Sequence, residues 1–227
     1  MISCSTPESL VNQRLIVKIK AWPRNSPFPI GQFVKVLGEE GKPSTERAMI
    51  LHEFNVDTRP FSTNVLKCLP KEGANFQVPE EERPKRWDLR HLPVCSVDPP
   101  GCKDIDDALH CRTLPNGNLE VGVHIADVTH FVKAGSELDR EAARRCTTVY
   151  LVGQRTDMLP KLLTETLCSL VCKVEKLAFS VLWEFDPKTM AILNIKYGKS
   201  IIYSQASLTY YQAQDMIDDA KDNSDMK

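Results

Sequence analysis

The segment PNGNLEVGVHI, residues 115–125, decides the fold class of this chain. From Leu119 to Ile125, apolar residues alternate with small or polar ones, and a period of two is typical of a strand with one buried face. The Asn-Gly pair at 116–117 favours a tight turn between antiparallel strands. We therefore predict a strand pair joined near these two residues.

Helix and strand patterns alternate after this pair. Ser136 precedes an acidic turn, as an N-cap does, and Pro160 stands at a first helical position. The predicted elements are helices at 136–145, 160–169 and 209–220 and strands at 178–185 and 192–203. We therefore expect residues beyond 90 to form an α+β domain.

The first seventy residues instead contain short strand-like runs separated by turn residues. Strands are predicted at 15–20, 33–37 and 48–54. Because no amphipathic helix there is long enough to cover a sheet, this spacing favours a small closed β-barrel. Gly, Pro and dense charge at 71–90 then indicate a linker.

One face of the predicted barrel is basic. Residues 1–35 contain five Lys or Arg residues and one Glu, which gives a charge of +4. Such a face can follow a phosphate backbone, and Trp22 is available to stack on a base. A solvated strand face in a β-domain of any function is the alternative interpretation.

Length, composition and charge limit the number of domains and the classes of protein that this chain can belong to. The 227 residues are 42% hydrophobic and 26% charged, which is ordinary for globular protein and allows one large domain or two smaller ones. The net charge of -1 gives no overall signal for nucleic acid or membrane. No apolar run reaches the roughly 18 residues of a membrane span, and the first residues lack the layout of a secretion signal, so we expect a soluble intracellular protein.

The eight cysteines are scattered and include no C-x-x-C pair. Their spacing argues against a disulfide framework and against a zinc site, and the five histidines form no ligand pattern either. We expect reduced thiols that are mostly buried.

The candidate catalytic residues are concentrated in the segment SVDPPGCKDIDDAL, residues 96–109. This segment contains four carboxylates: Asp98, Asp104, Asp106 and Asp107. The Pro-Pro-Gly sequence after the first one favours a turn that folds it towards the others. Carboxylates about 5 Å apart would repel by roughly 3 kcal/mol per pair at an effective dielectric near 20, so a tight group requires a cation. Carboxylate oxygens select hard ions, and a site that acts on phosphate would hold Mg²⁺.

The acidic segment is also open to interpretations that involve no catalytic Mg²⁺. An exposed acidic loop is the simplest, although flanking apolar residues indicate a loop embedded in a core. An EF-hand is excluded, since neither the glycine at loop position six nor the glutamate at position twelve follows Asp104 or Asp106. A D-x-D sugar-nucleotide site or an aspartyl-phosphate enzyme would leave Asp98 and Asp107 unexplained.

At these residues the chain resembles the RNase II (RNB) family of 3′–5′ exoribonucleases, and within it the branch that includes the catalytic subunit of the eukaryotic RNA exosome. The matching stretches are 22–26, 88–90, 96–110, 116–128, 147–151 and 167–170. The resemblance implies an OB-type cold-shock RNA-binding domain at 1–75, a linker at 76–90 and a truncated RNB catalytic domain at 91–227.

The resemblance also implies the chemistry. The four aspartates would be catalytic and hold Mg²⁺, and hydrolysis would release nucleoside 5′-monophosphates one at a time from the 3′ end of single-stranded RNA. Tyr150 would bind that 3′ end, although a tyrosine between two aliphatic residues is otherwise typical of a core. His124 and Asp127 lie in the same motif and are interpreted as structural.

The implied partners are single-stranded RNA and the exosome core, in the processing of RNA such as rRNA and in RNA decay, in the nucleus or the cytoplasm. A noncatalytic single-stranded RNA-binding module that kept the fold and lost the chemistry is the competing hypothesis. Because a full RNB domain is longer than the part present here, we expect a fragment whose isolated chain has a poorly closed core and weak or no activity.

Overall fold

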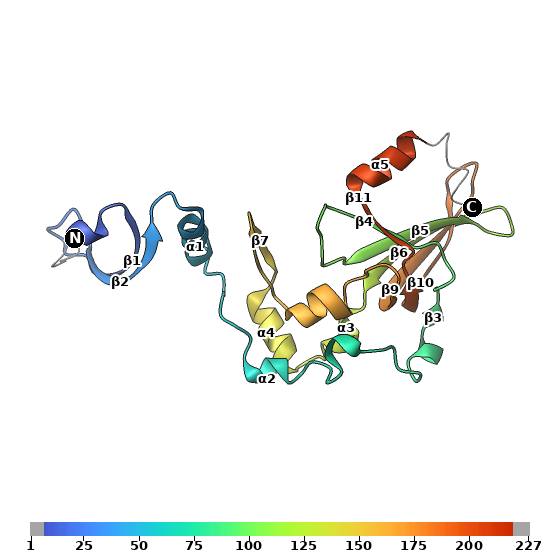
Figure 1. Ribbon diagram of the computed structural model, residues 1–227, viewed down its shortest axis with the longest axis horizontal. Coiled ribbons are helices and arrows are strands. Elements are labelled where there is room, and N and C mark those ends of the chain that lie inside the picture. Colours follow the sequence, from blue (N-terminus) through green and yellow to red (C-terminus); the bar gives the residue numbers. More distant parts are fainter. Residues whose placement is uncertain (1–6, 220–227) are drawn as a thin grey trace. The chain divides into compact units, whose positions relative to one another are not determined.

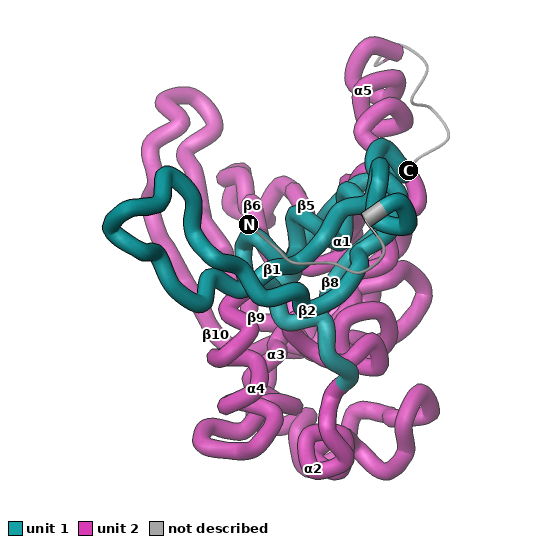
Figure 2. Tube along the Cα trace, turned by 90° about the vertical axis from the view of Figure 1, so that its left-hand side faces the viewer, with its two compact units in different colours: residues 1–60, 148–156 teal, residues 61–147, 157–227 magenta. Residues whose placement is uncertain are grey.

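The computed structural model describes residues 7–219 and divides the chain into two compact units. The first unit comprises the chain up to Pro60 together with Thr148–Thr156, and the second comprises Phe61–Thr147 and the residues from Asp157 onward (Figure 2). The short segment at 148–156 therefore belongs to the same unit as the N-terminal region, although it lies far from it in sequence.

The first unit is built on an antiparallel strand pair. Its elements are η1 (Pro7–Leu10), β1 (Gln13–Ala21), β2 (Ile30–Glu39), α1 (Pro43–Glu53), β7 (Val149–Leu151) and β8 (Gln154–Thr156) (Figure 1). Strands β1 and β2 pair from Gln13 with Glu39 to Ala21 with Ile30, which confirms the first two predicted strands. Arg47 of α1 donates to the Val152 carbonyl oxygen and so ties the β7–β8 hairpin to this unit.

The third strand predicted for this region is wrong, because residues 48–54 belong largely to helix α1. Pro43 stands in the first turn, where its fixed φ suits a helix. Ala48, Met49 and Leu51 are good helix formers, and Leu51 is buried, so packing agrees with propensity. The described residues thus supply two strands of the expected barrel here, with a helix after them.

The second unit contains a seven-stranded mixed sheet in the order β11-β4-β5-β6-β9-β10-β3. Its strands are β3 (Trp87–Asp88), β4 (Cys95–Asp98), β5 (Asp107–Thr113), β6 (Leu119–Ala126), β9 (Glu175–Phe185), β10 (Ile192–Tyr203) and β11 (Ala206–Thr209). Strands β5 and β6 are antiparallel and joined at the predicted Asn-Gly turn. The predicted strands at 178–185 and 192–203 are confirmed as β9 and β10.

The helices of this unit are α2 (Thr63–Leu66), η2 (Gly73–Asn75), η3 (Arg83–Lys85), α3 (Val128–Phe131), α4 (Glu137–Arg145), η4 (Leu162–Leu167) and α5 (Tyr210–Asp218). The three predicted helices are confirmed as α4, η4 and α5, with one difference in geometry, whereas the other four were not predicted. Segment η4 is a π-helix, in which the Cys168 amide donates to the Leu163 carbonyl oxygen at 2.9 Å. The predicted end of α5 at Ala220 lies outside the described residues.

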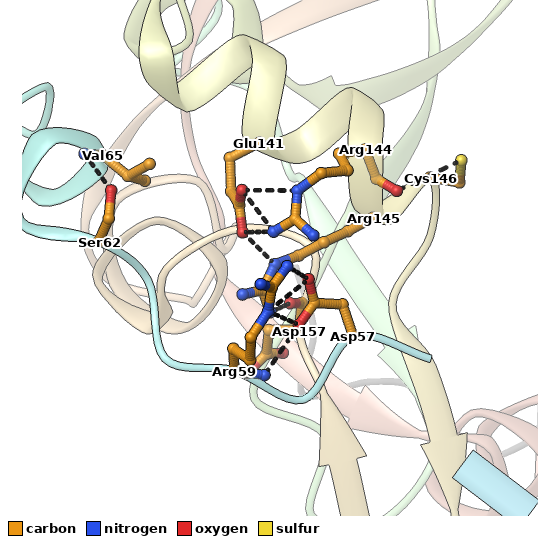
Figure 3. A network of polar contacts seen from close by, with 9 residues as sticks. All are labelled: Asp57, Arg59, Ser62, Val65, Glu141, Arg144, Arg145, Cys146 and Asp157. Atoms are coloured by element: carbon orange, nitrogen blue, oxygen red, sulfur yellow. Dashed lines mark hydrogen bonds and ion pairs between the residues drawn. The ribbon is translucent and has the colours of Figure 1, made fainter. Parts of the chain in front are cut away.

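Helix α4 is held by its cap and by ion pairs. The Ser136 hydroxyl accepts from the Asp139 amide, as predicted. Glu141 pairs with Arg144 at 2.6 Å and with Arg145 at 2.8 Å (Figure 3). The Arg145 guanidinium also lies 4.0 Å from the centre of the Phe61 ring, which joins the helix to the segment before α2.

The hydrophobic core lies between the helices and one face of the sheet. It includes Leu138 of α4, Leu163 of η4, Ala108 of β5 and Ala178 of β9. Burial of each leucine stabilises the fold by roughly 1.5–3 kcal/mol. The mixed sheet with its packed helices confirms the predicted α+β fold class.

Two further expectations concern cysteines and membranes. The seven described cysteines are free, as expected, but Cys168 alone is buried, so the prediction of mostly buried thiols is wrong. Within residues 7–219, no helix combines the length and the apolar character needed to cross a membrane.

Candidate active site in the acidic loop

The four aspartates lie on the loop between β4 and β5 in the second unit. Asp98 is the last residue of β4, and Asp107 is the first of β5. The Cys102 amide donates to the Pro99 carbonyl oxygen at 3.1 Å, and Gly101 has φ 80°. These features form the tight turn expected from Pro-Pro-Gly, because a positive φ at the third turn position favours glycine.

The rest of the loop is fixed by Ser169, which lies two residues after the end of η4. The buried Ser169 hydroxyl donates to the Lys103 carbonyl oxygen at 2.8 Å and accepts from the Ile105 amide at 3.1 Å. The Leu170 amide donates to the Ile105 carbonyl oxygen at 2.8 Å. The backbone between Lys103 and Ile105 is therefore held by residues more than sixty positions away in sequence.

Two of the carboxylates act on the same thiol. Cys102 Sγ lies 3.8 Å from Asp104 Oδ1. Burial raises the pKa of the Cys102 thiol, and the negative charges of Asp98 and Asp104 raise it further. Asp98 and Asp104, which lie on either side of the turn, therefore both affect the pKa of the Cys102 thiol.

The other two carboxylates are exposed and lie at the entry to β5. The Asp106 carbonyl oxygen accepts from the Ala126 amide at 2.9 Å, and Asp107 pairs in register with Ile125. Burial raises the pKa of Cys168 to about 12, and the charge of Asp106 adds to this shift, so Asp106 acts on a different thiol from Asp98.

The expected tight group of all four carboxylates is not found. In the described part of the chain, no three His, Cys, Asp or Glu side chains are gathered so that they could hold a metal ion. Ser169 and Leu170 fix the backbone at Ile105. Asp106 and Asp107 beyond it are exposed, whereas Asp98 Oδ2 is buried, so the four carboxylates lie in different environments.

One oxygen in the loop nevertheless has the character of a cation ligand. Asp98 Oδ2 is buried and has no hydrogen-bond partner among the described residues. A buried carboxylate oxygen without a partner is costly, and a cation removes that cost. The donor set of the loop consists of carboxylate oxygens, which suits Mg²⁺ rather than a softer metal.

Tyr150 lies on β7, in the first unit, whereas the aspartates lie in the second. Its residue surface is 63% exposed, which excludes the core interpretation. Tyr150 pairs in register with Arg155 of β8 on the two-stranded hairpin. Tyr150 is therefore a surface residue of this hairpin.

The neighbouring motif residues have structural roles, as the sequence suggested. The Asp127 carboxylate forms ion pairs with Arg86 at 2.8 Å and with Lys199 at 3.2 Å, and it accepts from the Thr129 hydroxyl at 2.6 Å. Burial opposes ionisation of Asp127, but hydrogen bonds from Thr129, Arg86 and Lys199 outweigh it and lower its pKa. His124 is fully buried and hydrogen-bonded on both ring nitrogens.

Sequence reasoning missed Ser169 and the pair formed by Arg86 and Asp127. The signal for Ser169 was a hydroxyl within the otherwise apolar LCSL segment at 167–170. A buried hydroxyl needs a partner, so this serine had to bond to some backbone group. Which backbone it meets depends on the tertiary fold.

Comparison with protein-family models matches two regions of the chain. An RNB domain model matches residues 86–227, and a Dis3-like cold-shock domain 2 (CSD2) model matches residues 3–55. The fold and the acidic loop thus define a class of protein in which a cold-shock-type domain precedes an RNB domain. The chain belongs to the RNB domain family, and its two matches identify it with the Dis3-like members of that family.

A curated relative in this family is much longer than the chain. The human exosome complex exonuclease RRP44 is 55% identical over 218 residues, which cover 96% of this chain and 22% of that protein. The chain therefore spans about a fifth of the length of this relative.

Solved structures share the fold. Mycoplasma genitalium RNase R in complex with ribose methylated single-stranded RNA matches with a TM-score of 0.79 and 25% identity, over 92% of this chain and 32% of that one. Yeast Ssd1, described as a pseudonuclease, matches with a TM-score of 0.74 and 26% identity, over 94% of this chain and 26% of that one.

Proposed function

We propose that the chain is the part of a 3′–5′ exoribonuclease that carries the acidic catalytic loop, and that the enzyme hydrolyses single-stranded RNA to nucleoside 5′-monophosphates with Mg²⁺. The observation that carries the proposal is the Asp98–Asp107 loop, which lies within the matched RNB region and holds a buried, unpartnered carboxylate oxygen. The relative named an exosome complex exonuclease supports RNA processing and decay with the exosome core as the setting.

The proposal assigns roles to both parts of the chain. Residues 1–75 would contact RNA as a cold-shock domain, and residues 91–227 would belong to the catalytic domain, with the linker at 76–90 between them. Lys18 and Lys20 on β1 and Lys35 on β2 are exposed, as backbone-binding residues must be. Trp22, 63% exposed, offers a stacking surface.

In the proposed reaction the four aspartates would hold Mg²⁺. When bound, such an ion would lower the pKa of a water and stabilise the negative charge that develops in the transition state. Phosphoryl transfer depends on positioning and charge more than on a covalent intermediate, so no nucleophilic side chain is required. The protein contributes a fixed loop, because Ser169 holds its backbone, and Tyr150 would place the 3′ nucleotide by stacking.

The test follows the fate of 3′-end-labelled single-stranded RNA with the chain in excess, in Mg²⁺ and in EDTA. We expect slow release of labelled mononucleotide that requires the metal and falls by about two orders of magnitude or more in Asp107→Asn, since the loss of a metal ligand removes transition-state charge stabilisation. Asp215→Asn, which changes an exposed aspartate of α5, is the matched control and should keep the wild-type rate. Release that persists in EDTA would contradict the proposal.

A noncatalytic RNA-binding module is the second candidate. The specific observation in its favour is the similar fold of Ssd1, a pseudonuclease. Under this alternative, the chain would retard RNA equally with and without metal and would release no mononucleotide, and Asp107→Asn would behave like Asp215→Asn. A gel-shift assay run beside the nuclease assay separates the two candidates.

A further inference from the structure

A cleft of about 420 Å³ opens in the second unit, and the residues that line it include Phe76–Val78, Glu165–Leu167 and Val174–Leu177. Its volume falls within the range of about 300–1,000 Å³ that small-molecule sites occupy. Phe76, Phe131 and Val171 form part of its apolar wall. These residues lie outside the acidic loop, so the cleft is not accounted for by the proposed nuclease chemistry.

Lys176 brings a buried amine to this cleft. The residue is 8% exposed, and its Nζ donates to the Thr166 carbonyl oxygen, which also lines the cleft. An ammonium group has three donors, and within residues 7–219 no Asp or Glu side chain forms an ion pair with this one. Burial lowers the pKa of Lys176, because the charged form is poorly solvated there.

The other charged side chains that line the cleft already form ion pairs with residues of opposite charge. Arg83 pairs with Glu80 at 2.9 Å and with Glu175 at 3.1 Å. Glu175 pairs in addition with Arg90. Glu165 faces Lys161 at 3.9 Å. Lys176 is therefore the group whose charge a ligand can still neutralise.

We propose that this cleft binds a small amphipathic monoanion of the medium-chain carboxylate class. Its apolar chain would lie against Phe76, Phe131 and Val171, and its head group would pair with the Lys176 ammonium. A carboxylate there would accept from the donors that Thr166 does not use, and charge-assisted bonds of this kind are strong in a buried setting. The arrangement matches the usual design of ligand sites, in which an apolar wall provides contact area and one charged group fixes orientation.

The test uses octanoate as the probe and calorimetric titration of the full chain. Lys176→Met keeps most of the side-chain volume and removes the charge, so we expect octanoate binding to weaken by about tenfold or more. Lys173→Met, at an exposed lysine three positions earlier, is the matched control and should bind as wild type. Unchanged octanoate affinity in Lys176→Met would overturn the proposal.

A second comparison separates the charge from the apolar contact. Octanamide has the same chain without the anion, and we expect it to bind wild type and Lys176→Met alike and more weakly than octanoate binds wild type. Octanoate should also raise the thermal midpoint of wild type and of Lys173→Met, and raise it less in Lys176→Met. Equal binding of octanoate and octanamide to wild type, or no saturable octanoate binding, would also overturn the proposal.

Discussion

At the scale of single residues, a chain of hydrogen bonds crosses the buried face of the second unit's sheet. His110 Nε2 lies 3.3 Å from Glu120 Oε1, and His110 Nδ1 lies 2.8 Å from His124 Nε2. His124 Nδ1 lies 2.6 Å from Ser180 Oγ, which lies 2.6 Å from Ser200 Oγ. Burial lowers the pKa of both histidines, which favours neutral rings. Because a carboxylate only accepts, a neutral His110 donates to Glu120 and accepts from His124, and the Ser180 hydroxyl donates to His124.

This chain of hydrogen bonds predicts a loss of stability in acid. Burial lowers the pKa of His124 to about 4, with the neighbouring His110 adding to the shift, whereas an unfolded histidine has a pKa near 6.5. As the pH falls from about 6.5 to about 4, the unfolded chain takes up a proton that folded His124 does not. The free energy of unfolding should drop by roughly 3 kcal/mol over that window.

Urea unfolding at several pH values measures this dependence. His124→Gln should have a shallower slope between pH 6.5 and 4 together with lower stability at pH 7. An equal slope in His124→Gln and wild type would show that His124 is not held neutral.

Sequence reasoning could reach some of these residues and not others. The turn after Asp98 was predictable, because proline and glycine restrict the backbone locally in any fold. The anchoring of Ile105 by Ser169 was not, because it joins residues that meet only after the sheet and η4 have packed. Gly122 is a similar case: an added Cβ would lie 2.2 Å from His110 Cε1, a close approach that only the folded sheet creates.

At the scale of elements, strands and caps with local signals were predicted well. Helix α1 was the exception, because AMILHEF at 48–54 suits a strand as well as a helix when it is considered alone. Burial of Thr45 and Leu51 decides in favour of the helix, and that burial depends on tertiary packing. A short apolar run in this chain therefore does not distinguish a strand from a helix by its sequence pattern alone.

The N-cap of α4 gives a test at this scale. Ser136 Oγ accepts from the Asp139 amide at 3.1 Å, and an acidic first turn adds to the favourable charge at the helix N-terminus. Ser136→Ala should lower the free energy of unfolding by about 1 kcal/mol. Ser207→Ala, at an exposed serine of β11, should change it by less than about 0.5 kcal/mol. Equal effects of the two substitutions in chemical denaturation would show that the cap does not stabilise the helix.

At the scale of the whole molecule, one face of the seven-stranded sheet is apolar and uncovered in the second unit. Leu109 of β5, Ile125 of β6, Phe179 of β9 and Tyr197 of β10 are 42%, 45%, 41% and 71% exposed. The strand register places all four residues on the same face of the sheet. Ile125 of β6 pairs with Phe179 of β9, and the β6 partner of Leu109 pairs with the β9 partner of Tyr197. Contiguous apolar surface of this kind favours association.

The chain alone should therefore self-associate. We expect sedimentation velocity to show a mass that rises with concentration, and Phe179→Lys to reduce this rise. Val152→Lys, at the exposed tip of the β7–β8 hairpin, is the control and should leave the rise unchanged. A monomer at every concentration would show that this face does not drive association.

The central claim is that the aspartates of the β4–β5 loop bind a divalent cation. Its most direct test is a titration of the chain with Mn²⁺, in which electron paramagnetic resonance measures the free ion and Mg²⁺ competes for the site. We predict saturable binding that Mg²⁺ displaces, that Asp98→Asn weakens by about tenfold or more, and that Asp215→Asn leaves unchanged. Mn²⁺ binding of equal strength in wild type and Asp98→Asn would contradict the claim.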